Sequence, residues 1–578
     1  MPILVGGGPA RTLAEFESFV RSELAKANLP PLTLALGLAD LGPTLTIGDL
    51  QSVRGPTVIG IATALHIALN AITENYPLIP TEDRPFRTNV DAAVKTASEA
   101  EGVIPDDLAQ AQRTNAGDLA SHRAVLAAAR RALVSNLCEG YAYQSSIVYR
   151  VANTLVLLGL KSFRGLAASS DEVDSLFNEF VGLRAYDYVL TLFALWSLAV
   201  KGSALDSRFF LSEGPRRNEL IVPVGSVIEE LARDFDKYRL FEDLPQAESY
   251  TGKARACAFF SRWPLIRLNE HQFIFFAHPF FKIQIASKSV TKALALARKR
   301  ERGEPRTAFS QWLGGRLEAF FSELCELWRP GEHFPEYEYI QGQKSPDQIV
   351  FERHGSKEVA CLFQLKAKML TEAAHFGSSD ESVRRDLAGA FSETLYKTIQ
   401  FIVRAEAAAR NERLKPENAA LTRRILGCER FCMIGIVPDM PSVFTFRDMR
   451  EILLEEVESH LEPGEREWFR QHFVRKCVWH VMELEEFERF LSIPQGERQI
   501  YKRITGYLRE ADPAGDIIKR GLLPSNFRSY LIRKFGRYDA ATNERRLDLY
   551  VPELRELFNE FAADARKYFS TKATSPGT

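Results

Sequence analysis

The chain has 578 residues, of which 46% are hydrophobic and 26% charged, and its formal net charge is −1. This length exceeds that of one ordinary core and suggests roughly three or four domains of about 150 residues each. The apolar and charged fractions are typical of a globular protein and argue against a fibrous or disordered chain. The net charge excludes a globally basic protein, so any surface for nucleic acid has to be regional.

The cysteines and the apolar segments predict a cytoplasmic protein without a membrane anchor. Seven cysteines are scattered along the chain with no secretory signal before them, as expected for reduced thiols. Cys428 and Cys432 have no second Cys/His pair close by, which favours buried thiols over a zinc site. The two most apolar segments, 57–72 and 186–200, are shorter than the ~20 residues that span a bilayer, so both are expected to be buried helices.

Residues 1–260 are expected to form an α-helical N-terminal region. Apolar residues at helical spacing begin at 11–26 and recur in Ala- and Leu-rich segments separated by Pro and Gly. The expected helices after the first are 57–72, 89–100, 106–134, 144–160, 172–183, 186–200 and 227–238. The best strand candidate is 219–224. No cluster of His, Cys or acidic residues stands out here, so the sequence of this region predicts no site.

The pattern changes at residues 261–305, which we interpret as a linker made of a β-hairpin and a basic helix. Two apolar runs within 263–277 flank a turn at 269–271. A basic helix at 293–302 then ends at a Gly-Glu-Pro break. A solvated helix end explains these charges more simply than a contact with DNA.

Short strands alternate with helices over residues 306–490, which predicts an α/β layer domain. The expected elements are a helix at 309–327, strands at 336–340, 347–351 and 358–366, a long helix at 386–413, and β-rich runs at 428–437 and 476–482. The remainder, 491–578, returns to a helical pattern. The sequence therefore predicts an α+β multidomain protein with a mostly helical N-terminal half and a helical C-terminal tail.

Within the tail, residues 527–538 interleave aromatic and basic side chains. Such a mixture can bind phosphates and stack on bases. An amphipathic helix shows the same alternation, and we favour core packing with a solvated basic face.

The residues that suggest chemistry lie in the predicted α/β domain. Asp347 opens a short apolar run, and Gln364 and Lys366 close the next one after a turn at 354–356. Alternate side chains of a strand share a face, so Gln364 and Lys366 project together, and a tight connection brings Asp347 alongside. An oxygen-rich corner with a lysine beside it is what metal-assisted phosphodiester hydrolysis requires.

This ordered set resembles the PD-(D/E)XK nuclease superfamily over residues 306–490. Pro346 and Asp347 match the PD element, and Gln364-Leu365-Lys366 matches the (D/E)XK element. Glu318 matches the acidic residue on the helix that precedes the core sheet. The resemblance implies a restriction-endonuclease-like α/β core with a mixed central sheet, and a DNA endonuclease of prokaryotic defence or restriction.

The resemblance also implies a role for each matching residue. Asp347, Gln364 and Glu318 would be ligands of a Mg²⁺ or Mn²⁺ ion, together with the Leu365 carbonyl. Lys366 would orient or help to deprotonate the attacking water and offset charge on the scissile phosphate. No P-loop lysine motif is present, so an ATP-driven motor would be a separate protein.

The helix that follows the second strand carries Lys397, Gln400 and Arg404 on one face, at i, i+3 and i+7. The resemblance implies that these side chains hold the DNA backbone through phosphate contacts. It also leaves room for a homodimer, or for a partner protein in a defence system.

One departure from the motif keeps a second function open. Where the superfamily has its second acid, this chain has Gln364, which offers a carbonyl oxygen to a metal but no negative charge. Metal affinity should fall as a result. The alternative to a nuclease is therefore a protein of the same fold that binds nucleic acid, or acts as a scaffold, without cleaving.

Overall fold

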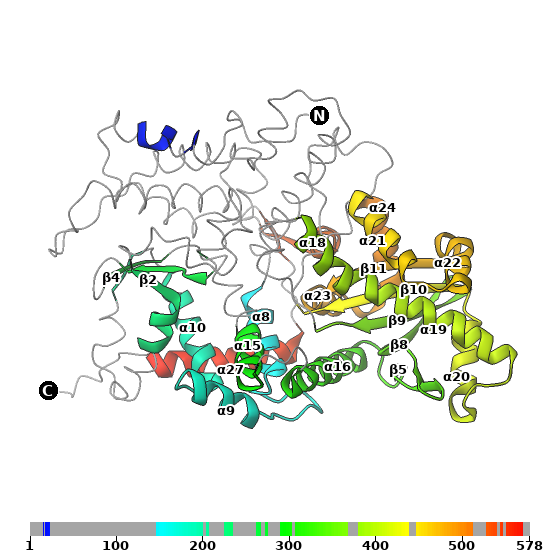
Figure 1. The fold of residues 1–578 in the computed structure, drawn as a ribbon, viewed down its shortest axis with the longest axis horizontal. Coiled ribbons are helices and arrows are strands. Elements are labelled where there is room, and N and C mark those ends of the chain that lie inside the picture. The colour runs from blue at the N-terminus through cyan, green and yellow to red at the C-terminus, as the bar shows by residue number, and fades with distance from the viewer. Residues whose placement is uncertain are drawn as a thin grey trace.

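The computed structural model, drawn in Figure 1, describes part of the chain. The described residues are 15–16, 18–22, 146–199, 204–206, 225–234, 260, 262–267, 272–275, 289–302, 307–367, 380–438, 447–511, 527–539, 544–546 and 551–569. The helices expected at 57–72, 89–100 and 106–134 and the strand expected at 219–224 lie outside these residues. The described part of the first expected helix, within 15–22, is helical.

A five-stranded mixed sheet organises the second half of the chain (Figure 1). The strand order is β11 (Cys477–Glu483), β10 (Arg430–Val437), β9 (Lys357–Leu365), β8 (Gln348–His354) and β5 (His333–Pro335). Strands β9, β10 and β11 run parallel, whereas β8 is antiparallel to both β9 and β5. The described chain is therefore α+β with a mixed sheet, as predicted.

Alternation along the strands divides the sheet between two apolar layers. In β9, Cys361 and Phe363 belong to one layer, and Ala360 and Leu362 belong to the other, as the two-residue period of a strand requires. All four side chains are buried. A strand covered on both faces is apolar throughout, which is why the run at 358–366 could be predicted as a strand.

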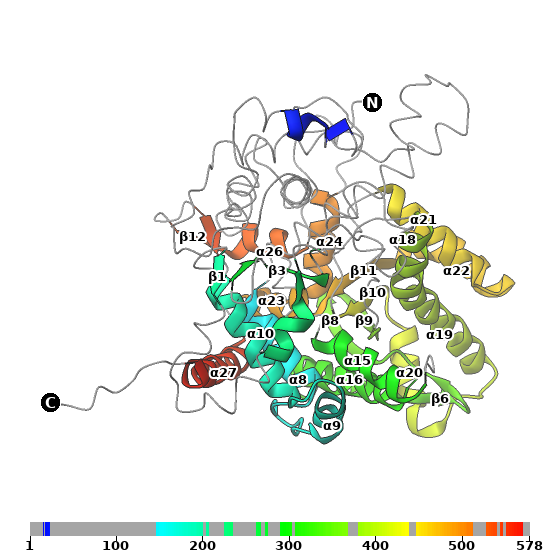
Figure 2. The same cartoon turned by 60° about the vertical axis from the view of Figure 1, so that its left-hand side comes forward.

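Helices cover both faces of this sheet (Figures 1 and 2). Helices α16 (Ala308–Trp328) and α23 (Leu484–Ser492) contribute to the layer that contains Phe363, and α19 (Glu393–Arg410) and α21 (Arg447–Ser459) contribute to the opposite one. The sheet is thus the middle of three layers, and α16 and α19 lie on opposite sides of it.

The helix predicted at 386–413 is interrupted. Helix α18 (Asp380–Leu387) leads into a π-helical turn at Ala388–Ser392, after which α19 follows. Such turns are rare and leave no signature in the apolar spacing. Helices α20 (Pro416–Leu426) and α22 (Pro463–Lys476), each with a proline in the first turn, are additional to the predicted elements.

A small hairpin follows α16. Strand β6 (Glu338–Ile340) is antiparallel to β7 (Gln343–Lys344), and Gly342 between them has a φ of +71°. The strand predicted at 336–340 is confirmed in β6. Strands β5 and β7 are too short and polar to give a period-two signal.

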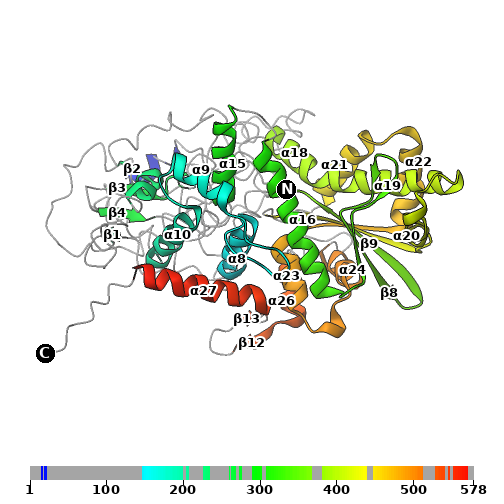
Figure 3. The same cartoon turned by 90° about the horizontal axis from the view of Figure 1, so that it is seen from below.

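Helices from before and after the five-stranded sheet in sequence share one apolar cluster. Helices α8 (Ile147–Leu157), α9 (Asp171–Phe180) and α10 (Ala185–Ala199) confirm three predicted helices. Helix α27 (Pro552–Phe569) packs along α8 and α10 (Figure 3), and this cluster extends to α16, α23 and the sheet. Apolar packing therefore crosses the predicted boundaries at 260, 305 and 490.

A second, four-stranded sheet lies between α10 and the five-stranded sheet in sequence. Its strand order is β1 (Ala204–Asp206), β4 (Gln272–Phe275), β3 (Leu265–Arg267) and β2 (Ala232–Asp234). The hairpin predicted within 263–277 is confirmed by β3 and β4, which are antiparallel. The helix predicted at 227–238 instead stops at residue 231, and β2, which begins at the next residue, pairs with β3. The predicted basic helix is α15 (Ser289–Arg300).

The tail is not wholly helical. Helices α24 (Ile500–Ala511) and α26 (Phe527–Phe535) are followed by the hairpin of β12 (Arg537–Asp539) and β13 (Glu544–Arg546). Two members of the aromatic and basic run are buried, since Arg528 is 0% and Tyr530 3% exposed. Core packing is confirmed for Tyr530, whereas the prediction of a solvated basic face is wrong for Arg528, which is buried among carboxylates.

Gly435 in β10 sets how closely α19 approaches the sheet. A Cβ added there would lie 2.7 Å from Thr394 Oγ1 and 2.8 Å from Val481 Cγ2. We expect Gly435→Val to lower the free energy of unfolding by roughly 1–3 kcal/mol, because the inserted atoms overpack the layer. Urea unfolding measures the loss. Gly464→Ala is the control, since its Cβ would meet no described atom within 4 Å; a Gly435→Val protein as stable as that control would contradict the prediction.

Candidate active site

The β8–β9 hairpin brings Asp347 to the end of β9. The register pairs Gln348 with Phe363, so Asp347, one residue earlier, lies opposite Gln364. Asp347 Oδ2 accepts hydrogen bonds from the Leu365 amide nitrogen at 2.5 Å and from Gln364 Nε2 at 2.7 Å. The predicted convergence of Asp347 and Gln364 therefore occurs, and it depends only on a local hairpin.

Asp347 is held in an environment that disfavours its charge. The side chain is only 8% exposed. Burial raises the pKa of Asp347 to about 7; the Leu365 N–H opposes this, and the carboxylates of Glu318 and Glu336 reinforce it. Both side-chain hydrogen bonds that Asp347 accepts from described residues end on Oδ2, and among these residues none donates to Oδ1.

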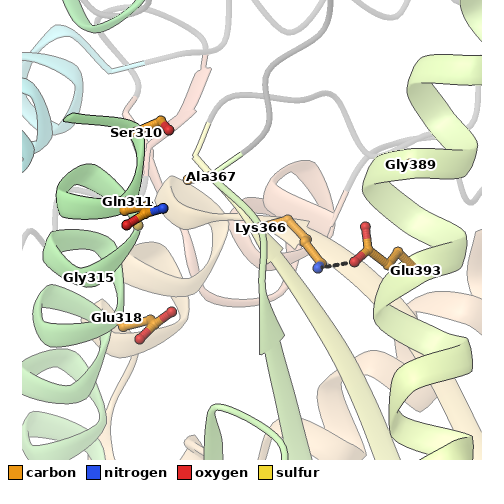
Figure 4. A pocket seen from close by; sticks show the side chains of 9 residues that line it. Ser310, Gln311, Gly315, Glu318, Lys366, Ala367, Gly389 and Glu393 are labelled. Carbon is orange, nitrogen blue, oxygen red and sulfur yellow. Dashed lines mark hydrogen bonds and ion pairs between the residues drawn. The ribbon is translucent and has the colours of Figure 1, made fainter. Parts of the chain in front are cut away.

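Lys366 follows β9 and reaches across to α19 (Figure 4). Its backbone nitrogen donates to the Ile436 carbonyl at 2.9 Å, which continues the pairing with β10. Its Nζ lies 2.5 Å from Glu393 Oε1, and Lys397 Nζ lies 2.7 Å from the same oxygen. Burial lowers the pKa of Lys366, although the Glu393 carboxylate opposes the change. Burial would raise the pKa of Glu393, but the two ammonium groups outweigh it and hold that pKa low.

Glu318 faces Lys366 and Glu393 from α16, across a cavity of about 580 Å³ (Figure 4). Partial loss of solvation raises the pKa of Glu318; the Glu336 carboxylate adds to this effect, and the ammonium groups of Lys344 and Lys366 oppose it. The cavity is lined by Ser310, Gln311, Gly314, Gly315, Glu318, Lys366, Ala367, Gly389 and Glu393. Two of the four predicted catalytic residues, Glu318 and Lys366, thus line the cavity, whereas Asp347 and Gln364 do not.

Of the three residues predicted to bind nucleic acid, one lies beside the cavity and two do not. Lys397 lies beside the cavity through its ion pair with Glu393. Gln400 Nε2 donates to Glu465 Oε2 at 3.3 Å, and Arg404 Nε donates to Glu465 Oε1 at 2.9 Å. Glu465, on α22, is 3% exposed. Gln400 and Arg404 therefore join α19 to α22 instead of lining the cavity.

Sequence reasoning missed Glu393. Its signal was the i, i+4 spacing to Lys397, which favours an ion pair on a helix. The π-helical turn just before it, Ala388–Ser392, precedes the helix start that carries Glu393. The spacing of apolar residues does not predict that turn.

The donor set suits a hydrated Mg²⁺ ion better than a metal held wholly by protein. In the part of the chain that is described, no group of three or more His, Cys, Asp or Glu is arranged to hold a metal. Mg²⁺, however, keeps several waters and commonly uses one or two carboxylates. Asp347, through Oδ1, and Glu318 could supply these.

The rate at which the Lys366 amine is acetylated depends on these ion pairs. Measuring that rate therefore tests the geometry without an assay of enzymatic activity. Removing the Glu393 charge by Glu393→Gln favours the neutral amine, so acetylation of Lys366 at pH 8 should become roughly 3–10-fold faster. Lys397→Met should slow it, because the Lys397 charge helps to lower the pKa of Lys366. Mass spectrometry of acetic-anhydride-treated protein gives the rates. Equal rates in the two variants would contradict the arrangement.

Among the described residues, no helix has the length and apolar character needed to cross a membrane. Comparison of the chain with protein-family models, with curated proteins and with solved structures finds no match.

Proposed function

We propose that this protein is a metal-dependent DNA endonuclease with a PD-(D/E)XK-like core, and that Asp347, Lys366, Glu318 and Gln364 form its site. The observation that carries the proposal is the meeting of Asp347 with Gln364 and Leu365 directly before Lys366, where the hydrogen bonds from described residues end on Oδ2 of Asp347 and none ends on Oδ1. The cavity that opens from Lys366 to Glu318 provides space for a substrate at the same point.

Each side chain has a role that follows from its surroundings. Asp347 and Glu318 would hold the metal ion, which when bound lowers the pKa of a water and neutralises charge on the phosphate. Lys366, whose pKa is lowered, would accept or orient a proton of the attacking water. Gln364 keeps Asp347 oriented through its amide hydrogen bond without adding charge. Glu393 is a positioning residue that holds the Lys366 amine in the cavity.

One observation favours the second candidate, a nucleic-acid-binding protein that does not cleave. A carboxylate oxygen only accepts hydrogen bonds, so Gln364 turns its NH₂ group toward Asp347. Its carbonyl oxygen, the atom a metal would need, then points elsewhere. In that case a metal ion would have fewer protein ligands than in a nuclease with two acids.

The deciding experiment is plasmid cleavage by the full chain with Mg²⁺, Mn²⁺ or Ca²⁺, alongside single-stranded DNA and RNA. We expect Mg²⁺ or Mn²⁺ to support cleavage, and Asp347→Ala and Lys366→Ala to reduce the rate by about 100-fold or more. Lys357→Met is the matched control, because this exposed lysine pairs with Glu429 at the other end of β9. Cleavage that persists in both site variants would overturn the assignment. Binding without cleavage by the unmodified protein would favour the second candidate.

A further inference from the structure

Three cationic side chains lie together at one end of the five-stranded sheet, away from the candidate site. The register of β10 and β11 pairs Phe431 with Cys477, so Arg430, one residue earlier, lies beside Lys476, the last residue of α22. Burial raises the pKa of the Cys477 thiol to about 12, and the charges of both Lys476 and Arg430 oppose this rise. Arg475 precedes Lys476 in the last turn of α22 and is exposed, as Lys476 is, whereas Arg430 is half-buried. We call Arg430, Arg475 and Lys476 the basic edge.

The charges of the basic edge are not neutralised within the described part of the chain, where no carboxylate forms an ion pair with any of the three. Two acids at the same end of the sheet have other partners. Glu429 pairs with Lys357 at 3.2 Å, and Glu358 pairs with Arg424 at 2.8 Å. Neighbouring like charges repel. Basic residues in a last helical turn favour the helix, which accounts for the two on α22 but not for Arg430, which is on a strand.

The cavity at the candidate site does not offer a comparable surface. Among its lining residues, Glu318 and Glu393 carry carboxylates and Lys366 carries the single ammonium group. Such a wall does not attract a polyanion by itself. A nuclease with this cavity therefore needs a cationic surface elsewhere to gain affinity for its substrate.

We propose that the basic edge binds the phosphate backbone of nucleic acid without a divalent cation and is a second contact for the substrate, remote from the cavity. The choice of nucleic acid as the partner rests on the proposed function. From Arg430 to Ile436, which accepts from the Lys366 N–H, β10 spans roughly 20 Å at about 3.3 Å per residue. The basic edge therefore contributes affinity and does not touch the phosphate that would be cut at Lys366.

The composition of this surface favours nucleic acid over an acidic protein segment. Two of its three members are arginines, whose planar guanidinium group binds phosphate through paired hydrogen bonds. A protein partner normally requires buried apolar and aromatic anchors. Val474, which precedes Arg475, is the single large apolar side chain exposed in the part of the chain that the structure describes. Interfaces with nucleic acid, in contrast, are polar and positively charged.

The test removes all three charges in one variant, Arg430→Gln/Arg475→Gln/Lys476→Gln. Fluorescence anisotropy with labelled duplex DNA, in EDTA and at several salt concentrations, gives Kd and its salt dependence. Each phosphate contact contributes about 0.9 to the slope of log Kd against log salt concentration. We expect the slope to fall by about two to three and Kd at low salt to rise more than tenfold. Thermal unfolding should show no decrease in Tm, because the substitutions remove repulsion.

The matched control removes two arginines and one lysine from the end of α15, as Arg298→Gln/Lys299→Gln/Arg302→Gln. All three side chains are exposed, and we expect Kd to change by less than about threefold. A second measurement uses the unmodified protein. Duplex DNA in EDTA should slow acetylation of Lys476 at least threefold and leave the rate at Lys299 unchanged, as read by mass spectrometry.

The outcomes separate this proposal from the nuclease. Equal Kd in the two triple variants, no protection of Lys476, or no DNA binding in EDTA would overturn the basic edge, whether or not the protein cleaves. Weaker binding in the basic-edge variant, with no cleavage by the unmodified protein in Mg²⁺, would support the basic edge and overturn the nuclease. Oligoglutamate of matched charge that binds as tightly as DNA would overturn nucleic acid as the partner.

Discussion

Asp347→Asn is expected to abolish metal-dependent cleavage and, at the same time, to make the protein more stable at pH 8. The amide is nearly the same size as the carboxyl, and its oxygen can still accept from Leu365 N and Gln364 Nε2. It removes the charge that burial disfavours. One pKa unit corresponds to about 1.4 kcal/mol, so the gain in the free energy of unfolding should be roughly 2–4 kcal/mol.

The sign of this effect depends on pH. The pKa of Asp347 is about 7 in the folded chain, above its ordinary value of 3.8. Between these values the folded state holds a proton that the unfolded state has released, so this group's contribution to stability falls as pH rises and is at its least favourable above pH 7. Asparagine is neutral throughout. The stability difference between variant and unmodified protein should be smallest near pH 4 and complete by pH 8.

Urea unfolding at several pH values in EDTA measures this difference. Added Mg²⁺ should then stabilise the unmodified protein and not Asp347→Asn, because the metal binds the ionised carboxylate. Cleavage should likewise rise with pH as Asp347 loses its proton near pH 7. A variant that is less stable than the unmodified protein at pH 8, or that still cleaves, would contradict the role given to Asp347. Retention of a destabilising charge at this position is what a functional site would require.

The site could be predicted where it depends on short-range structure. Asp347 and Gln364 meet because a two-strand hairpin with a turn at Gly355 fixes their register, and that turn is visible in the sequence. Glu393 could not be placed in the same way. Its position depends on how α19 crosses the sheet, and Gly435 permits that close approach from another strand.

The residues predicted to contact DNA depend on packing between distant segments. Gln400 and Arg404 do lie on one face of a helix, as the spacing indicates. Their partner, Glu465, is more than 60 residues away and belongs to α22, a helix that sequence reasoning did not identify. A face can therefore be predicted from periodicity, whereas the element that covers it depends on packing between distant segments.

The packing of α27 against α8 could not be predicted from the sequence either. Helix α27 meets α8 through contacts that span about 400 residues, such as the Val551 N–H donating to Tyr149 Oη at 3.3 Å. Each helix is amphipathic and identifiable alone. The apolar spacing of each helix does not indicate which other helix packs against it. The core that α8 and α27 share is therefore known only from the structure.

Arg528→Met is expected to lower the free energy of unfolding by about 3–5 kcal/mol, the usual result of breaking a buried ion pair by removing one partner. The guanidinium is 0% exposed and lies 2.8 Å from Glu483 and 3.3 Å from Glu485. It belongs to a buried cluster where α8, α23 and α26 meet. The cluster comprises Arg150, Glu483, Glu485, Glu486, Glu488, Arg489 and Arg528, all less than 9% exposed. Without Arg528, the carboxylates keep too little compensating charge in an apolar surrounding.

The matched variant Glu488→Gln should behave differently. Four carboxyl groups face three guanidinium groups in this cluster, and Glu488, which accepts from Asn153 Nδ2 at 3.2 Å, forms none of the described salt bridges with the arginines. Burial raises the pKa of Glu488 well above its usual range, which favours the neutral carboxyl in the folded protein. Glutamine preserves that neutral state and its hydrogen bond, and we expect the change in stability to be within about 1 kcal/mol, or favourable as pH rises. Urea unfolding of both variants at pH 7 measures the change in the free energy of unfolding. Equal decreases in Arg528→Met and Glu488→Gln would mean that Glu488 is ionised and contradict the prediction.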